Sequence, residues 1–268
     1  MLPHQNEEKL LTEVLPNVAS QLRLSLGNLH IAMKHLTPPE DKWSPQTSIL
    51  YQSYYRMLRL VNNISAAPLL QEEGLFCTEN TEICAWLENL CRQAQPLFEE
   101  AGVALVYRSE LSSHIAAIHP THLERLVWNL LSNALKFTPR GGTVTVCLRQ
   151  SSGQLLLQVE DTGCGIPEEL LETVFERWLH PEQMDPQPHG LGLGLPLCRR
   201  IAEGHGGRLL LRSKVGEGTA VTVSLPDRRC KTGLLKSPAF HYAGGFQPVV
   251  MELSDGLPYQ AFQPKHLD

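Results

Sequence analysis

The chain has 268 residues, of which 42% are hydrophobic, and a formal net charge of −5. This length allows one large or two modest domains. The acidic balance argues against nucleic acid as the main partner, because phosphate neutralisation needs a basic face. No apolar run approaches the roughly 18–20 residues of a membrane span, and the N-terminus is not a signal peptide. Seven cysteines without paired metal spacing suit a reducing compartment, so we expect a cytoplasmic protein.

The first seventy residues carry two amphipathic helical patterns, over residues 5–36 and from about Gln46 to Leu69, separated by prolines. Two such helices cannot cover their own apolar faces, so a four-helix bundle in a symmetric homodimer is expected. The alternative is a hairpin packed on the rest of its own chain. The expected stripes are Leu15, Leu22, Leu29 and Leu36 with Leu11, Val18, Ser25 and Ala32, and then Leu50, Tyr54, Met57, Val61 and Ile64.

Residues 76–226 alternate between helical and extended patterns. A helix is expected over 83–101, ended by Gly102, and another from Pro167 to about Phe175. Strands are expected at 103–107, 115–118, 144–148, 155–159, 209–212 and 220–225. The pattern predicts a mixed, largely antiparallel sheet with helices on one face. Cys77, Cys84 and Cys91 are expected as small core residues, and 249–262 as a β-hairpin or a partly ordered tail.

Three polar residues of the segment that starts at His122 share one helical face. Asn129, Asn133 and Lys136 stand at i, i+4 and i+7, and most apolar residues of the segment fall on the other side. Amide oxygens are hard ligands for a magnesium ion that keeps several waters, and an ammonium offsets phosphate charge. The face suits a magnesium-bound polyphosphate, although an ordinary polar surface is the alternative.

Two glycine-rich turns follow. Asp161 ends a buried strand beside Gly163 and Gly165, where it could accept a hydrogen bond from an exocyclic amine such as that of adenine. Gly190, Gly192 and Gly194 open a helical pattern, and free N–H groups at a helix start bind phosphate. Their G-x-G-x-G spacing differs from the dinucleotide fingerprint, and no P-loop motif is present, so both of those sites are excluded.

Five segments in this order resemble the catalytic, ATP-binding domain of sensor histidine kinases, in the superfamily shared with gyrase B, MutL and heat-shock chaperones. The resemblance covers roughly residues 76–226. It implies an α+β protein: an N-terminal antiparallel helical hairpin, a four-helix bundle on dimerisation, then a two-layer α/β sandwich. The matching motifs are Asn129, Asn133 and Lys136 (N box), Asp161, Gly163 and Gly165 (G1 box), Phe175 to Trp178 (F box), Gly190, Gly192 and Gly194 (G2 box), and Gly216, Gly218 and Thr219.

The resemblance also implies domains and roles. The expected domains are a dimerisation hairpin at 1–72, a catalytic domain at 73–226 and an extension at 227–268. Asn129 and Asn133 would hold Mg²⁺, Phe137 would pack on the adenine ring, and residues 179–189 would form a mobile lid. The expected ATP-contacting residues are Asn129, Asn133, Lys136, Phe137, Asp161, Gly163, Gly165, Ile166, Gly190, Leu191, Gly192, Leu193, Gly194 and Thr219.

The usual phospho-accepting histidine is missing. In the segment that best fits the family's H-E-L-R-T-P-L pattern, Ser20 stands at the histidine and Gln21 at the acid. His30 and His35 are weak substitutes on the same helix. Two functions stay open: a histidine kinase with another acceptor, passing phosphate to a response regulator, or a pseudokinase that binds ATP and signals as a scaffold. A response regulator or another kinase is the expected partner.

Overall fold

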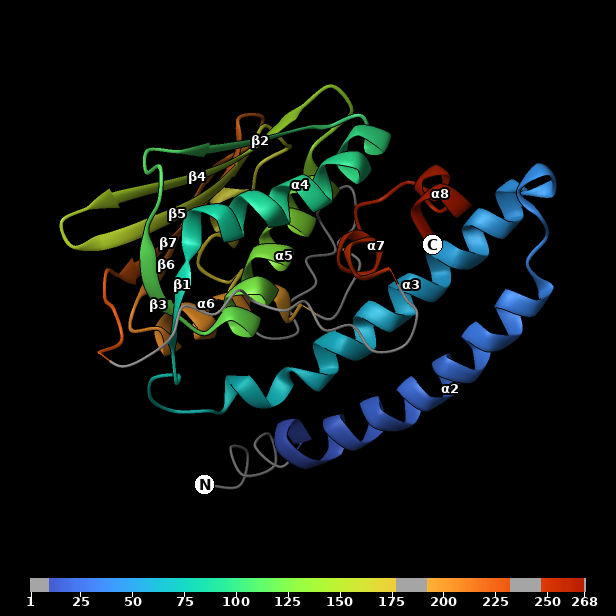
Figure 1. The fold of residues 1–268 in the computed structure, drawn as a ribbon, viewed down its shortest axis with the longest axis horizontal. Helices are drawn as coiled ribbons and strands as arrows, with labels where there is room; N and C mark the ends of the chain where they lie inside the picture. The colour runs from blue at the N-terminus through green and yellow to red at the C-terminus, as the bar shows by residue number, and fades with distance from the viewer. Residues whose placement is uncertain (1–9, 177–191, 232–246, 268) are drawn as a thin grey trace.

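A computed structural model describes residues 10–176, 192–231 and 247–267 and confirms the expected α+β class. Two long antiparallel helices, α2 (Leu15–Leu36) and α3 (Pro45–Ser65), precede a unit in which helices cover one face of a sheet (Figure 1). Within these described ranges, no helix is long and apolar enough to cross a membrane.

The main sheet has five strands in the order β2-β4-β5-β7-β6. β2 pairs with β4 in parallel, and the other three pairings are antiparallel, so the expected mixed sheet is confirmed. A separate antiparallel pair joins β1 to β3. The strands are β1 (Glu79–Glu82), β2 (Ala104–Ser109), β3 (Ile115–Ile118), β4 (Thr143–Ser151), β5 (Gln154–Asp161), β6 (Arg208–Lys214) and β7 (Gly218–Pro226).

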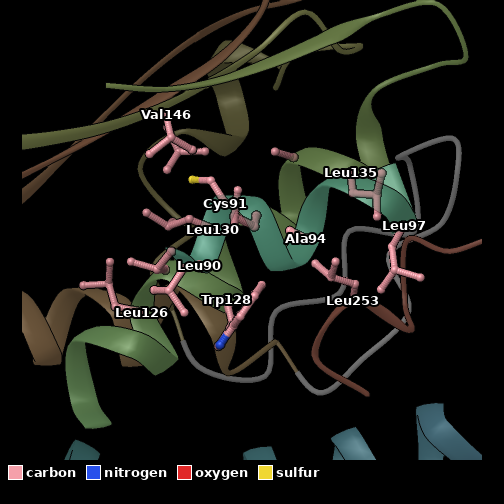
Figure 2. Packing of buried hydrophobic residues seen from close by; sticks show 14 of the residues in the cluster. Leu90, Cys91, Ala94, Leu97, Leu126, Trp128, Leu130, Leu135, Val146 and Leu253 are labelled. Atoms are coloured by element: carbon pink, nitrogen blue, oxygen red, sulfur yellow. The ribbon is translucent and has the colours of Figure 1, made fainter. Parts of the chain in front are cut away.

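Helices α4 (Ile83–Ala101), α5 (Pro120–Phe137) and α6 (Gly194–Gly204) lie on the same face of this sheet. Figure 2 shows how the core forms between the layers: Cys91 of α4 and Leu130 of α5 approach Val146 of β4, and Leu90 of α4 lies near Leu126 and Trp128 of α5. Cys84 and Cys91 are buried as expected, but Cys77 is exposed because it lies before β1, outside any packed element.

Local signals set the bounds of α4. The Glu82 side chain accepts from the Ala85 N–H at 2.6 Å, and Gly102 ends the helix in the left-handed region at φ +76°. A carboxylate at the N-cap satisfies a free N–H, and glycine adopts the left-handed conformation without steric cost. The helix therefore occupies the predicted residues 83–101.

Tyr54 and Val61 of α3 are buried as predicted, but α2 buries a different stripe from the predicted leucines. Leu22, Leu29 and Leu36 are exposed on α2, whereas Ala19, Leu26, His30 and Met33 are buried. The His30 ring stacks on Tyr54 of α3, with 5.4 Å between the centroids. In a two-helix contact each helix buries one narrow face, so the remaining apolar positions stay on the outside. The predicted leucine stripe forms this outer face.

The side of α3 that does not contact α2 packs against α5 and the C-terminal residues of the same chain. This arrangement is the alternative that the sequence left open, a hairpin packed on the rest of its own chain. Arg125 of α5 donates to the Asn62 carbonyl at 3.3 Å, and the Tyr55 and Phe262 rings lie 6.0 Å apart. The expected homodimer stays a prediction.

Two predicted elements are wrong. Residues 249–262 form no β-hairpin: α7 (Pro248–Leu253), a 3-10 turn at Tyr259–Ala261 and α8 (Pro264–Leu267) lie between α3 and the α4–α5 layer (Figure 1). The residues after Pro167 form a 3-10 turn at Glu168–Leu170 instead of a helix. None of the side chains in described residues 168–176 is buried, so no packed apolar face supports a helix there.

Candidate functional site

Asp161 lies at the centre of the site, at the end of β5 opposite Thr219 of β7. Its Oδ1 accepts from the Gly163 N–H at 2.9 Å and from the Thr219 N–H at 3.2 Å. Burial raises the pKa of this carboxyl above its usual value, and the two backbone N–H groups oppose that rise. The two bonds fix the direction of the carboxylate.

The turn after Asp161 docks on the end of α5. The Cys164 N–H donates to the Phe137 carbonyl at 3.2 Å, and a Cβ added at Gly163 would lie 2.5 Å from that same oxygen. Gly165 has φ +71°, and a Cβ there would overlap the Lys214 carbonyl. These glycines are needed for protein packing, a reason different from the ring approach inferred from the sequence. The adjacent Ile166 N–H donates to Ser213 at 2.8 Å.

The start of α6 approaches the other end of the polar face of α5. A Cβ placed on Gly194 would lie 3.6 Å from Asn129 Oδ1. Gly192 has φ +65°, and Leu193 is buried just before the helix. Gly190, Leu191, Trp178 and the expected lid at 179–189 lie outside the described residues. Among the described residues, Asn129 thus lies beside Gly194, and Phe137 lies beside the turn after Asp161; α5 links the two pairs.

Asn129 is buried, and an arginine from α3 engages it. Asn129 Oδ1 lies 3.5 Å from Arg59 Nη2, and Arg59 Nη1 donates to the Ser132 hydroxyl. Asn129 Nδ2 has no hydrogen-bond partner within the described part of the chain. Asn133, one turn further along α5, is half-buried. The two asparagines therefore have different surroundings in this conformation.

Lys136 is half-buried at the C-terminal end of α5, with Nζ 5.2 Å from the centre of the Phe137 ring. Burial lowers its pKa to about 8, the nearby Asp255 carboxylate raises it, and Arg59 and Arg56 lower it further. A surface pocket of about 440 Å³ opens beside it. This pocket is also lined by Arg56, Arg140, Asp255 and Tyr259.

Sequence reasoning missed Arg59, Ser132 and Asp255. Arg59 is 3% exposed and lies 3.4 Å from Asp255. The sequence did carry one signal for Arg59, because Gln52, Arg56 and Arg59 recur at i, i+4 and i+7 and so share one face of α3. A polar stripe of that kind indicates a second contact face. Asp255 carried no comparable signal.

The candidate acceptors are placed differently from one another. Ser20 is exposed on α2, as expected, and so is His35. His30 is buried against Tyr54, so a phosphoryl donor cannot reach its ring in this conformation. His35 is the accessible histidine of the two.

Comparison with known proteins identifies the class. Residues 118–229 match the family described as histidine kinase-, DNA gyrase B-, and HSP90-like ATPase. The match includes all the described residues expected to contact ATP, from Asn129 to Thr219. The chain therefore carries an ATP-binding domain of the histidine kinase type, as the resemblance implied.

Relatives extend the similarity beyond that domain. The histidine protein kinase DivJ of Caulobacter vibrioides is 31% identical over 225 residues, covering 79% of this chain and 36% of DivJ. The crystal structure of full-length ShkA in complex with AMPPNP matches 83% of this chain and 47% of its own, with a TM-score of 0.66 and 22% identity. Histidine kinase ThkA in complex with response regulator protein TrrA matches 84% of this chain and 64% of its own, with a TM-score of 0.56 and 18% identity. The chain thus spans about a third of the length of DivJ, and the two structures support the fold.

Proposed function

We propose that the chain binds Mg-ATP between α5, the turn after β5 and the start of α6, and transfers the γ-phosphoryl group to a histidine. One observation carries the proposal: the turn after Asp161 docks on Phe137 at one end of the polar face of α5, and Gly194 lies beside Asn129 further along the same helix, so three separate motifs line that face. The ATPase family match covers this whole region.

Adenine would bind at Asp161. Both described hydrogen bonds to this carboxylate use Oδ1, which leaves Oδ2 to accept from the exocyclic amine. Phe137, at the end of α5, is half-buried and offers its ring to the base. A carboxylate oxygen held in a fixed direction inside a largely buried site favours a ligand that donates to it over one that presents an acceptor.

The phosphates and their metal would lie along α5 towards α6. The amide oxygens of Asn133 and Asn129 fit Mg²⁺, which prefers oxygen ligands and keeps several waters. Bound there, the ion would offset phosphate charge and orient the γ-phosphoryl group. Lys136 would add positive charge, and the backbone N–H groups at the start of α6 would bind phosphate oxygens.

For phosphotransfer, a neutral imidazole nitrogen attacks the γ-phosphorus, the bond to the β–γ bridging oxygen breaks, and ADP leaves with that oxygen. Asn129 stands where the resemblance places a catalytic glutamate in the hydrolytic relatives. An amide cannot take a proton from water, so transfer to an acceptor is favoured over hydrolysis. The acceptor would be His35 or a histidine on a partner, since Ser20 occupies the usual position.

A pseudokinase is the second candidate. It is favoured by the exposed Ser20 at the acceptor position and by the burial of His30. Such a protein would bind ATP and signal through contacts of the hairpin without moving phosphate. Its partners would be those of the first candidate, a response regulator or another kinase. A cytoplasmic location is part of both proposals.

Incubation with γ-labelled ATP and Mg²⁺ tests the two. A histidine kinase gives an acid-labile, base-stable label on this chain or on a receiver protein, and His35→Ala removes a label carried in cis. Saturable ATP binding without any label supports the scaffold. If Mg-ATP does not bind at millimolar concentration, both candidates fail.

A further inference from the structure

The C-terminal clamp, residues 247–267, is the largest described feature that the proposed function does not use. It lies outside the matched ATPase segment and between α3 and the α4–α5 layer (Figure 1). Leu253 and Phe262 are fully buried, and Figure 2 shows Leu253 entering the core near Leu97 and Trp128. The clamp is therefore an integral part of the fold.

Polar side chains along α3 hold the clamp. Gln52 Nε2 donates to the Leu257 carbonyl at 2.8 Å, and Arg56 Nε donates to the Ser254 carbonyl at 3.2 Å. On the opposite side, Lys265 Nζ donates to Glu100 of α4 at 2.8 Å. These contacts join the hairpin and the ATPase unit through the clamp.

The clamp also reaches the polar face of α5. Gly256 packs so closely on α5 that an added Cβ would lie 2.9 Å from the Lys136 backbone nitrogen. The Asp255 carboxylate forms an ion pair with Arg59 at 3.4 Å. Its negative charge also raises the pKa of Lys136. One clamp carboxylate thus faces two cations from different parts of the chain.

Arg59 connects the clamp to the proposed metal ligand. The same guanidinium that pairs with Asp255 also lies at Asn129 Oδ1 and bonds Ser132. A Mg²⁺ ion at this amide oxygen would lie close to the Arg59 guanidinium, and the two positive charges repel each other. Mg²⁺ at Asn129 therefore requires Arg59 to move away.

We propose that the C-terminal clamp is an autoinhibitory device: Asp255 holds Arg59 on Asn129, so the clamp must loosen before Mg-ATP binds fully. This inference rests on the proposed nucleotide site and assigns its regulation. The phosphates of the nucleotide and the Asp255 carboxylate are alternative anions for the same cations, Lys136 and Arg59. Since binding and clamping exclude each other, each weakens the other by the same factor.

The apparent nucleotide affinity of the wild-type chain is reduced by the fraction of molecules that are clamped. Loosening the clamp without touching the nucleotide site raises the affinity. Two variants do this by different routes. Asp255→Asn removes the charge that fixes Arg59, and Gln52→Ala removes only the bond to Leu257. Ser53→Ala is the matched control, because Ser53 is the next residue of α3, is exposed, and bonds within its own helix.

Binding of a fluorescent ATP analogue with Mg²⁺ should tighten at least about fivefold in Asp255→Asn and Gln52→Ala, the lower end of typical coupling between sites. Ser53→Ala should bind like the wild type. If only Asp255→Asn binds the analogue more tightly, the gain comes from the lost charge beside Lys136, and the inference that the clamp is autoinhibitory is overturned. Equal binding by all four proteins overturns it as well, and leaves the proposed function standing.

Hydrogen exchange gives a second measure. The amides of residues 248–257 should exchange faster when saturating Mg-ADP is added to the wild-type chain, because the clamp loosens. Unchanged or slower exchange at saturation contradicts the inference. Absence of nucleotide binding in every variant, including the two with a loosened clamp, overturns the proposed function and this inference together.

Discussion

The Thr219 N–H donates to Asp161 Oδ1 at 3.2 Å across the β5–β7 pair, and this bond orients the buried carboxylate. The Gly163 N–H donates to the same oxygen, so Oδ2 is the oxygen that the proposed site leaves to accept from adenine. A polar group held so rigidly selects for the hydrogen-bonding pattern of the base rather than for its shape.

Asp161→Asn should weaken ATP binding by tenfold or more. The side-chain oxygen must still accept the two backbone N–H groups, so the new amide nitrogen points outward and opposes the adenine amine. A mismatched buried pair costs about 1–3 kcal/mol. Titration with ATP and with inosine triphosphate measures this loss of affinity. The base of inosine triphosphate carries a carbonyl where adenine has its amine. The variant should lose its preference for ATP, whereas undiminished ATP binding excludes Asp161 from the site.

Gly163→Ala should destabilise the fold by about 1–3 kcal/mol, as overpacking of a close contact does. Its Cβ would lie 2.5 Å from the Phe137 carbonyl, so the turn and the end of α5 would separate. Urea unfolding measures the change. Gly27→Ala is the control, and it is expected to stabilise the protein. Nothing lies within 4 Å of the Cβ added there, so replacing a helical glycine of α2 should raise the free energy of unfolding by about 0.5–1 kcal/mol. Equal stability of the two variants would refute this packing account.

How far the sequence predicts the structure depends on how local the deciding interactions are. The 83–101 helix follows from Glu82 and Gly102 at its ends, and the β4–β5 hairpin from alternating apolar residues around Gly153. The β-hairpin suggested for the C-terminal segment is wrong because Val249 to Leu253 is a short, mostly apolar run, which fits either a strand or a helix. Its burial between α3 and α5, which favours the helix, depends on residues almost 200 positions away.

The candidate site also contains residues that local sequence patterns predict and residues that only long-range contacts place. The motif residues on α5 and β5 were found because their spacing and turn glycines are local features. The contact from Arg59 to Asn129 joins residues 70 positions apart, and no periodicity reports such a distance. The packing role of Gly163 was not predicted, because the carbonyl that it accommodates, that of Phe137, comes from another element.

Nucleotide affinity should fall as the pH rises through about 8, the value to which burial lowers the Lys136 pKa. Phosphate favours the protonated ammonium, so above this pH the free protein must take up a proton on binding. The affinity then falls by up to tenfold per pH unit. Lys136→Arg should remove this decline, since a guanidinium stays charged throughout. Nucleotide affinities of the wild type and Lys136→Arg, measured between pH 6.5 and 9.5, test this prediction. If affinity falls equally with pH in both proteins, a group other than Lys136 titrates.

The outer face of the hairpin should form a homodimer interface. Val18, Leu22, Leu29 and Leu36 of α2 are exposed at helical spacing, as are Leu50 and Met57 of α3, and exposed apolar side chains on one helix face favour an interface. Light scattering should give twice the chain mass of 29.9 kDa, and Leu22→Glu should return it to one chain. Leu24→Glu is the matched control: Leu24 is 65% exposed, and a two-residue step turns it to the far side of the helix. If Leu22→Glu leaves the mass unchanged, or if the wild type already has the mass of one chain, the stripe is not a dimer interface.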